Sequence, residues 1–339
     1  MEQTKYPLWE NRKSIGKPPV SFTVALVALT IILSSVTAGG FGGMFCTGLA
    51  GCAFAFLLVL RNSIIPWITL PLSFGVAFIL SGDILLSLCI LLYVPIGIVL
   101  AYCLFTERNL SVTVAALTVV TLVAMAAIFT VSLVQLYSAG IQESYKTFAK
   151  EAKESLFEMF SMMKVPTADG ESYILPEETV AGLIEAAIMV MPAVIVVTCE
   201  LLAYVTAKIF RAISKRLIPV FVLEKENGIT VSVPCAFIYL ISVGVSFFAT
   251  EASVVAYSAL NLAFILMPFC AVFGFVRLLG KGGIMRNKLS GKKRGILIAV
   301  MAFLIILSPI SFIQMLSTYA CIFVIFKAYF ERKKKSEQD

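Results

Sequence analysis

The sequence predicts an all-α fold: a polytopic membrane helical bundle of nine or ten transmembrane helices with its N-terminus in the cytoplasm. The first observation is composition. Of the 339 residues, 60% are hydrophobic and only 14% are charged, whereas soluble domains carry about 25% charged residues. The second is that the apolar residues fall in continuous runs of about 20, the length that crosses the hydrocarbon core of a bilayer. The third is an asymmetric distribution of basic residues, which predicts the orientation.

The apolar runs predict the individual spans, because a helix satisfies all of its backbone hydrogen bonds within the lipid. We expect eight of them at 21–38, 41–60, 64–80, 84–105, 111–137, 180–207, 233–249 and 253–279. A last apolar stretch covers 296–326 and would be about 46 Å long as one helix. It contains Ser308 and Pro309, a pair that favours a helix break. A hairpin turning near Pro309 gives ten spans, and one kinked helix gives nine.

The order of these segments predicts a single membrane domain over residues 1–339. Residues 1–20 are polar and basic and precede a full-length apolar run, so we expect no cleavable signal peptide. The domain then consists of a five-span N-terminal half, an outside linker, a C-terminal half and a basic cytoplasmic tail, at 21–137, 138–179, 180–326 and 327–339.

The basic residues orient the chain. With the N-terminus inside, alternation places nearly all lysines and arginines in cytoplasmic segments, and leaves outside only Lys146, Lys150, Lys153 and Lys164. This is a strong positive-inside pattern. The net charge of +7 is therefore explained by topology and by contact with anionic lipid, and not by nucleic-acid binding.

The outside linker contains a second kind of pattern. Over 141–164 apolar residues recur at spacings of three and four, and the opposite face is rich in glutamate and lysine, which predicts an amphipathic helix. Pro166 follows its end, and Asp169 and Gly170 predict a turn. Three interpretations stay open for this helix: a helix on the membrane surface between two halves of the bundle, a lid over an outward-facing cavity, and a docking site for a partner.

Several kinds of site are not predicted. The chain has no histidine, the commonest general base and metal ligand, and it lacks phosphate-binding and hydrolase motifs. None of the eight cysteines forms a CxxC pair, and they lie in or beside apolar runs, so we expect small buried side chains. We therefore predict a protein that is not an enzyme, with no cofactor and no metal site.

Polar residues within the spans are the candidate ligand-binding residues. Glu185 and Glu200 lie fifteen residues apart in one span, which places them about 22 Å apart along the helix and on roughly one side. Intramembrane carboxylates face the bundle interior, find a partner or become protonated. For Glu200 three roles stay open: snorkelling to the cytoplasmic headgroups, an interhelical hydrogen bond, and a ligand or coupling-ion site. Asn261 can also bridge helices. Pro192, between the two glutamates, is expected to kink the helix and free a carbonyl.

Small residues predict where helices pack closely. The segment GGFGGMFCTGLAGCAFA at 39–55 is rich in glycine and alanine, and Thr47 and Gly51 have the small-xxx-small spacing. This spacing lets two helix backbones approach closely. We expect a tight helix contact through Gly51, with a docking groove for a partner as the alternative.

The layout of five closely spaced spans, a long outside linker and further spans resembles the YybS-like family of predicted bacterial membrane proteins. The segment YVPIGIVLAYCLFTERN is similar to the family's Pro-Gly-Leu-Gly-Tyr segment through Pro95, Gly97 and Tyr102. The basic loop ISKRLIPVFVLEKENGITVSVP and the segment PFCAVFGF, with Gly274, are also similar. The resemblance implies a multi-pass protein of the bacterial cytoplasmic membrane.

The resemblance also implies two functions. The family is grouped with the substrate-binding S components of energy-coupling factor transporters, which dock on a coupling subunit with two ATPases, and with rod-shape morphogenesis proteins, which are scaffolds. We expect an S-component-like subunit that binds a small solute through Glu185, Glu200 and Asn261. The alternative is a membrane scaffold in cell-envelope growth, division or sporulation. The expected partners are the lipid bilayer and other membrane subunits or envelope proteins, and no nucleic acid.

Overall fold

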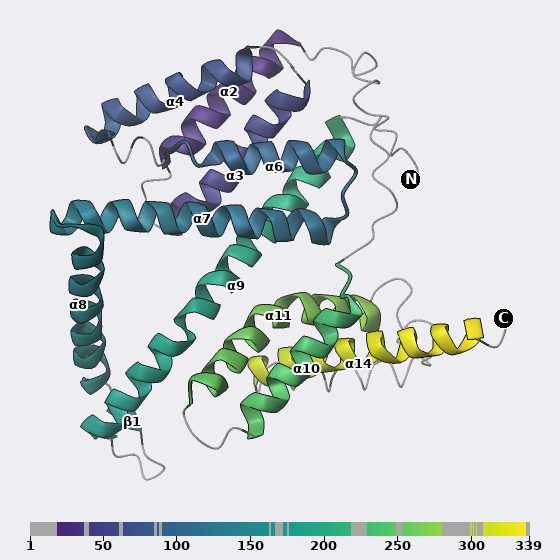
Figure 1. Ribbon diagram of the computed structural model, residues 1–339. Coiled ribbons are helices and arrows are strands. Elements are labelled where there is room, and N and C mark those ends of the chain that lie inside the picture. Colours follow the sequence, from purple (N-terminus) through teal and green to yellow (C-terminus); the bar gives the residue numbers. More distant parts are fainter. Residues whose placement is uncertain are drawn as a thin grey trace. The chain divides into compact units, whose positions relative to one another are not determined.

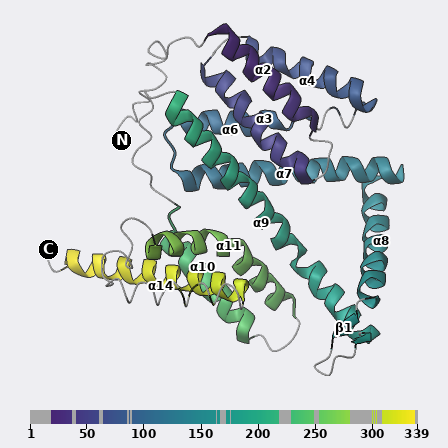
Figure 2. The same ribbon diagram turned by 180° about the vertical axis from the view of Figure 1, so that it is seen from behind.

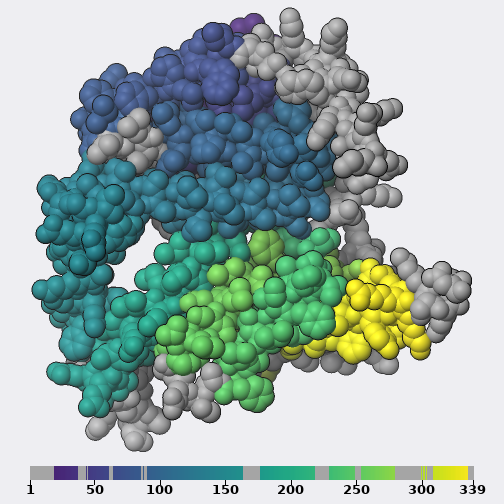
Figure 3. All heavy atoms as spheres, viewed as in Figure 1, coloured from purple at the N-terminus to yellow at the C-terminus, as the bar shows by residue number. Residues whose placement is uncertain are grey.

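The structure is a computed structural model, and the residues that it does not describe are grey in Figure 3. The described residues are 19–36, 41–60, 64–84, 87, 90–162, 164–166, 172–174, 176–217, 229–248, 253–279, 299, 301, 303 and 308–336. They form ten helices and one short hairpin, labelled in Figure 1. The helices are α2 Val20–Ser35, α3 Phe41–Leu60, α4 Ile65–Ser81, α6 Tyr93–Phe105, α7 Leu110–Tyr137, α8 Ile141–Ser161, α9 Glu177–Leu217, α10 Val233–Phe248, α11 Val254–Leu279 and α14 Pro309–Ser336.

Nine of these helices are apolar, which confirms the predicted class of helical membrane protein. Four are long and apolar enough to cross a bilayer, namely α7, α9, α11 and α14. The other five, α2, α3, α4, α6 and α10, are apolar but shorter within the described residues. The number of crossings and the cytoplasmic position of the N-terminus stay predictions.

One predicted span is interrupted. The sequence predicts a single helix over 84–105, but Leu91 and Leu92 form a turn, and α6 begins only at Tyr93. Proline explains the break: Pro95 has no N–H to donate to the carbonyl of Leu91, and its ring collides with that carbonyl in a continuous helix. With 13 residues, α6 is about 20 Å long, which is shorter than the hydrocarbon core.

Local chemistry sets several helix ends. The side chain of Asn109 accepts a hydrogen bond from the backbone N of Val112 at 2.9 Å and caps the start of α7, as expected for an N-cap asparagine. Gly82 ends α4 with a φ of 67°, a left-handed conformation that glycine adopts without strain. Ser138 ends α7 with a φ of 49°, and the chain there turns away from the α7 axis into α8 (Figure 1).

The linker predicted to lie outside, 138–179, contains a helix followed by a hairpin. The predicted amphipathic helix is confirmed as α8, which ends at Ser161 rather than at residue 164. The next residues form β1 Lys164–Pro166, which pairs antiparallel with β2 Ser172–Ile174, so the all-α prediction missed one small sheet. Aromatic rings hold α8 against α7: the ring centroid of Phe129 lies 5.8 Å from Tyr145 and 5.2 Å from Phe148.

The longest helix extends beyond its predicted span at both ends. We expected 180–207, whereas α9 covers Glu177–Leu217. Two acidic residues lie in its first turn and two basic residues in its last turn. Both placements stabilise the helix, because the charges interact favourably with the helix dipole. Pro192 lies inside the helix and does not end it.

The chain divides into two compact units, and α9 contributes to both. Unit 1 contains residues 1–188 and 198–226, and unit 2 contains 189–197 and 227–339. The predicted single membrane domain stays a prediction.

In unit 1 the relative directions of two helix pairs can be read from their contacts. Gly51 contacts Ile96, and Gly97 contacts Phe54 and Ala55, so residue numbers rise together and α3 runs parallel to α6. Contacts of α7 with α9 pair Met125 with Cys199 and Thr113 with Arg211, so these two helices are antiparallel. Both relations agree with the alternation of the predicted spans.

In unit 2, α10, α11 and α14 enclose a core that includes Tyr239, Cys270 and Cys321. The hydroxyl of Ser317 donates to the carbonyl of Met267 at 3.0 Å, and the sulfurs of Cys270 and Cys321 are 3.4 Å apart. Both residue numbers rise together, so α11 and α14 are parallel. The ten-span alternative requires this direction, and α14 begins at Pro309, the predicted break. The other arm of the expected hairpin, before residue 308, lies mostly outside the described residues.

Candidate functional site

Glu200 is an acidic residue with a buried side chain. It lies on α9 in unit 1 and is only 6% exposed. Its Oε2 atom is buried and has no hydrogen-bond partner among the described residues. Snorkelling, one of the three roles left open, does not fit a side chain that is withdrawn from the surface. A buried carboxylate without a partner is unfavourable in its charged form.

The buried position of Glu200 follows from the face of α9 that packs in unit 1. This face contains Cys199, Glu200, Ala203, Thr206, Ala207, Phe210 and Ser214, all buried. At about 100° per residue these positions cover one side of the helix, with Glu200 at its edge. Small residues on this face let other helices approach closely.

Specific contacts hold this part of α9 in place, and Figure 2 shows the course of the helix from behind. On α3, the thiol of Cys52 donates to the carbonyl of Thr206 at 3.7 Å, and the Phe56 and Phe210 rings lie 4.8 Å apart. Towards the C-terminal end of α9, Arg211 donates to the carbonyl of Arg108 at 2.5 Å and to Thr113 Oγ1 at 3.2 Å. The sequence analysis missed this role of Arg211, because it used the basic residues only to predict the orientation of the chain.

A small hollow lies one turn from Glu200. It is lined by Gly48, Ile96, Leu117, Thr121, Leu202, Ala203 and Thr206, which come from α3, α6, α7 and α9. Its volume is about 10 Å³, which is about the minimum that one water molecule needs. The hydroxyl residues Thr121 and Thr206 are the polar part of its lining. In this conformation the hollow has no room for a vitamin-sized solute.

Two polar side chains follow Glu200 on α9 at one and two turns, Tyr204 and Lys208, and they contact each other. The ammonium of Lys208 lies 5.7 Å from the centre of the Tyr204 ring, a cation–π distance. Both side chains are more exposed than Glu200. A hydrogen bond between Glu200 and Tyr204 is not among the hydrogen bonds of the described residues.

The structure does not bring the other two predicted ligand-binding residues to Glu200. Glu185 is exposed, although it lies on the same helix. Asn261 belongs to unit 2, where its Nδ2 donates to the carbonyl of Met189 at 2.8 Å. A helix-bridging role for Asn261 is therefore shown, and its role in ligand binding stays a prediction.

The contact of Asn261 is next to the proline of α9. Pro192 cannot donate to the carbonyl four residues before it, which is that of Ile188. Asn261 reaches the adjacent carbonyl, that of Met189, and so supplies a donor where the helix is weakened. This arrangement is common where prolines occur within membrane helices.

The predicted packing residues lie where close contact requires them. Gly51 and Gly97 face each other across α3 and α6: a Cβ atom on Gly97 would lie 2.8 Å from the carbonyl oxygen of Gly51. Pro95 is in the first turn of α6, where proline is tolerated. The tight helix contact predicted for Gly51 is confirmed, and it occurs within unit 1.

A polar contact near the other end of unit 1 was also missed. The side-chain nitrogen of Gln135 on α7 donates to Asp83 Oδ2, just after α4. The two residues are 52 positions apart, but both lie near ends of predicted spans on the same side of the membrane. That shared depth was the available signal.

Within the described residues, no group of three or more histidine, cysteine, aspartate or glutamate side chains could hold a metal ion.

Comparison with known proteins gives one finding on identity. Residues 24–276 match the model of a family described as predicted membrane protein (DUF2232). No curated protein and no solved structure matches the chain.

Proposed function

Since the chain belongs to the DUF2232 family of predicted membrane proteins, we propose that it is a non-enzymatic transport component that holds a small cation or a proton on Glu200. The observation that carries the proposal is the buried, unpartnered Oε2 atom of that residue. Ionisable residues within membrane segments commonly mark ion pathways and proton relays.

The size of the site supports a small ligand. The hollow one turn from Glu200 has a volume of about 10 Å³, so a vitamin-sized solute would need unit 1 to open. The hollow is lined by only two hydroxyl side chains, Thr121 and Thr206, whereas a divalent ion such as calcium takes six or more oxygens. A monovalent cation or a proton fits these groups better.

An S-component-like subunit remains the finer form of this proposal. It would act with a separate energy-coupling subunit, because this chain carries no phosphate-binding loop of its own. The helix α8 would then be a lid or a surface helix next to the entrance. The rival function is a membrane scaffold in envelope growth, division or sporulation. The small-residue contact between Gly51 and Gly97 is used inside unit 1, which leaves that pair unavailable to a partner.

The test compares two glutamates of one helix. The purified full-length protein is heated in mild detergent with NaCl, KCl or the bulky N-methylglucamine chloride, and its unfolding midpoint is recorded. A cation that binds only the folded state raises the midpoint. We expect a higher midpoint in one of the small-cation salts for the wild type and for Glu185→Gln, and no such difference for Glu200→Gln.

The variants also separate binding from structure. Burying an unpaired charge costs more than burying a neutral amide, so Glu200→Gln should fold at least as well as the wild type. The proposal is wrong if two results occur together. The unfolding midpoint of the wild type does not depend on the cation, and Glu200→Gln leaves the proton flux into proteoliposomes unchanged. Stoichiometric envelope proteins retained equally by the wild type and by Glu200→Gln in native mass spectra would establish the scaffold instead.

A further inference from the structure

We propose that the C-terminal part of α14, together with Arg277 of α11, forms a binding site for an anionic phospholipid. The site lies in unit 2, in the leaflet at the C-terminal end of α14, which the charge pattern predicts to be the cytoplasmic one. It is independent of Glu200 and of the function proposed above.

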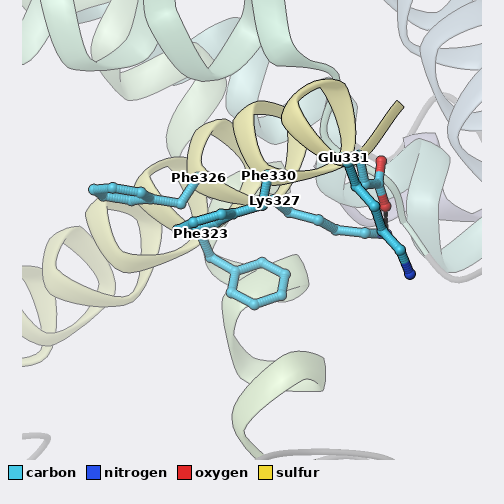
Figure 4. A pocket seen from close by; sticks show the side chains of 6 residues that line it. Phe323, Phe326, Lys327, Phe330 and Glu331 are labelled. Carbon is cyan, nitrogen blue, oxygen red and sulfur yellow. Dashed lines mark ion pairs between the residues drawn. The ribbon is translucent and has the colours of Figure 1, made fainter. Parts of the chain in front are cut away.

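A groove along one face of α14 combines aromatic and charged side chains (Figure 4). Its volume is about 460 Å³, and it is lined by Phe323, Phe326, Lys327, Phe330, Glu331 and Lys334. Spacings of three and four residues place all six on one side of the helix. Phe323 and Phe326 precede the first charge, and Phe330 lies among the charged residues that follow, so one end of the groove is apolar and the other is mainly charged. Phe326 and Phe330 are 57% and 60% exposed.

The depth of the groove in the bilayer follows from the sequence of α14. The helix begins at Pro309, and Lys327 is its first charged residue. The intervening 18 residues are about 27 Å long, which is close to the thickness of the hydrocarbon core. The boundary with the headgroups therefore lies near Lys327. Tyr329 and Phe330 follow it at headgroup level, where aromatic residues are enriched.

Arg277 adds a positive charge at the same level. It lies in the last turn of α11, which runs parallel to α14. Its guanidinium lies 4.9 Å from the ring centre of Phe323 and 5.7 Å from that of Phe273. Phe323 is one turn before Lys327, so Arg277 is held beside the groove where the apolar part meets the charged part.

The charges around the groove leave a net positive potential. Lys327 pairs with Glu331 at 3.5 Å, and these side chains are 52% and 64% exposed. Glu331 therefore offsets one positive charge and orients Lys327 towards the groove. Lys334 has no ion-pair partner among the described residues, and with Arg277 it leaves a net charge of about two positive units, which suits one phosphodiester.

An anionic phospholipid matches both ends of this groove. Its acyl chains can cover the rings of Phe323 and Phe326 at hydrocarbon depth, while its phosphate lies among the basic side chains at the boundary, next to Phe330. A soluble phosphate would leave the exposed rings unused. Clusters of basic residues next to the end of a membrane helix commonly bind anionic lipids.

The experiment uses two variants that remove the same charge from one helix. Lys334 lines the groove, whereas Arg332 lies two residues away, on the opposite side of α14. The full-length protein in neutral detergent is mixed with equal amounts of phosphatidylglycerol and phosphatidylcholine, and native mass spectra give the ratio of the two adducts. We expect wild type to prefer phosphatidylglycerol, Lys334→Gln to lower the ratio about fivefold, and Arg332→Gln to change it less than twofold. Phe330→Ala should reduce the retention of both lipids.

Three results would overturn the proposal. Equal losses in Lys334→Gln and Arg332→Gln would show diffuse attraction without a site. Displacement of the lipid by glycerol phosphate, which has the anionic group but no acyl chains, would identify a soluble phosphate site. A dimer in place of the lipid adduct, disrupted by Phe330→Ala, would identify an interface between two copies of the chain.

Discussion

Replacing Gly97 by alanine tests the close contact of α3 with α6 on which unit 1 is built. The added Cβ atom would lie 2.7 Å from Phe54 Cδ1, 2.8 Å from the carbonyl oxygen of Gly51 and 3.3 Å from the backbone N of Ala55. Two of these atoms are backbone, which can move only if the helices separate. The Phe54 ring is fully buried and lies 5.4 Å from the Tyr93 ring, so it has little room to rotate.

The magnitude follows from two opposing effects. Overpacking of this kind costs about 1–3 kcal/mol, and replacing a helical glycine by alanine contributes about 0.5–1 kcal/mol in the other direction. We expect the free energy of unfolding to fall by about 1–2 kcal/mol in Gly97→Ala. The matched control is Gly75→Ala in α4, where a Cβ atom meets no other atom within 4 Å, and its stability should be unchanged or slightly higher.

The assay is reversible unfolding of the full-length protein by SDS in mixed micelles, with helicity and tryptophan emission as two probes. A destabilised Gly97→Ala beside an unchanged Gly75→Ala supports the packing. Equal stability of the two variants would show that α3 and α6 are not packed at this distance and would refute the reasoning.

Three further results are expected. Asn261→Leu removes the hydrogen bond to the carbonyl of Met189 and should lower the free energy of unfolding by about 1 kcal/mol; no change in the same SDS assay would count against the bridge. Phe129→Ala removes two ring contacts, each contributing about 0.5–1.5 kcal/mol, and should speed proteolysis within α8, whereas Phe247→Ala, at a side chain that is 74% exposed, should not. Epitope tags at both chain ends should be protected on the same side of sealed vesicles, as ten spans require; tags on opposite sides would leave nine.

Much of the fold could be predicted because it depends on local properties of the chain. Most apolar runs became helices within a few residues of their expected bounds, since a membrane helix needs only about 20 apolar residues and its own backbone hydrogen bonds. The differences between the predicted and the observed elements also have local causes. Pro95 interrupts the predicted span 84–105, and Lys164–Pro166 forms a strand where a helix end was expected.

The candidate site could be predicted only in part. Periodicity placed Glu185 and Glu200 on roughly one side of a helix, but the structure exposes the first and buries the second. The reason is that the contacts of α9 with α3 and α7 shown above involve its residues 199–211, the segment that contains Glu200. Asn261 was a plausible ligand by residue type, yet its amide donates to the carbonyl of Met189, a contact over 72 positions in the chain that no local pattern contains.

The helical membrane class, the approximate position of most helices, the amphipathic character of α8 and the helix start at Pro309 are all local properties. They could be predicted because hydropathy, charge and proline act on the residues that carry them. Which polar groups are buried, and which atoms they contact, follows from the packing of the helices. This packing withdrew Glu200 from the surface, paired Gly51 with Gly97, and placed Arg277 beside the phenylalanines of α14. These outcomes depend on contacts between helices distant in the chain, and burial is a property of such contacts and not of any single segment.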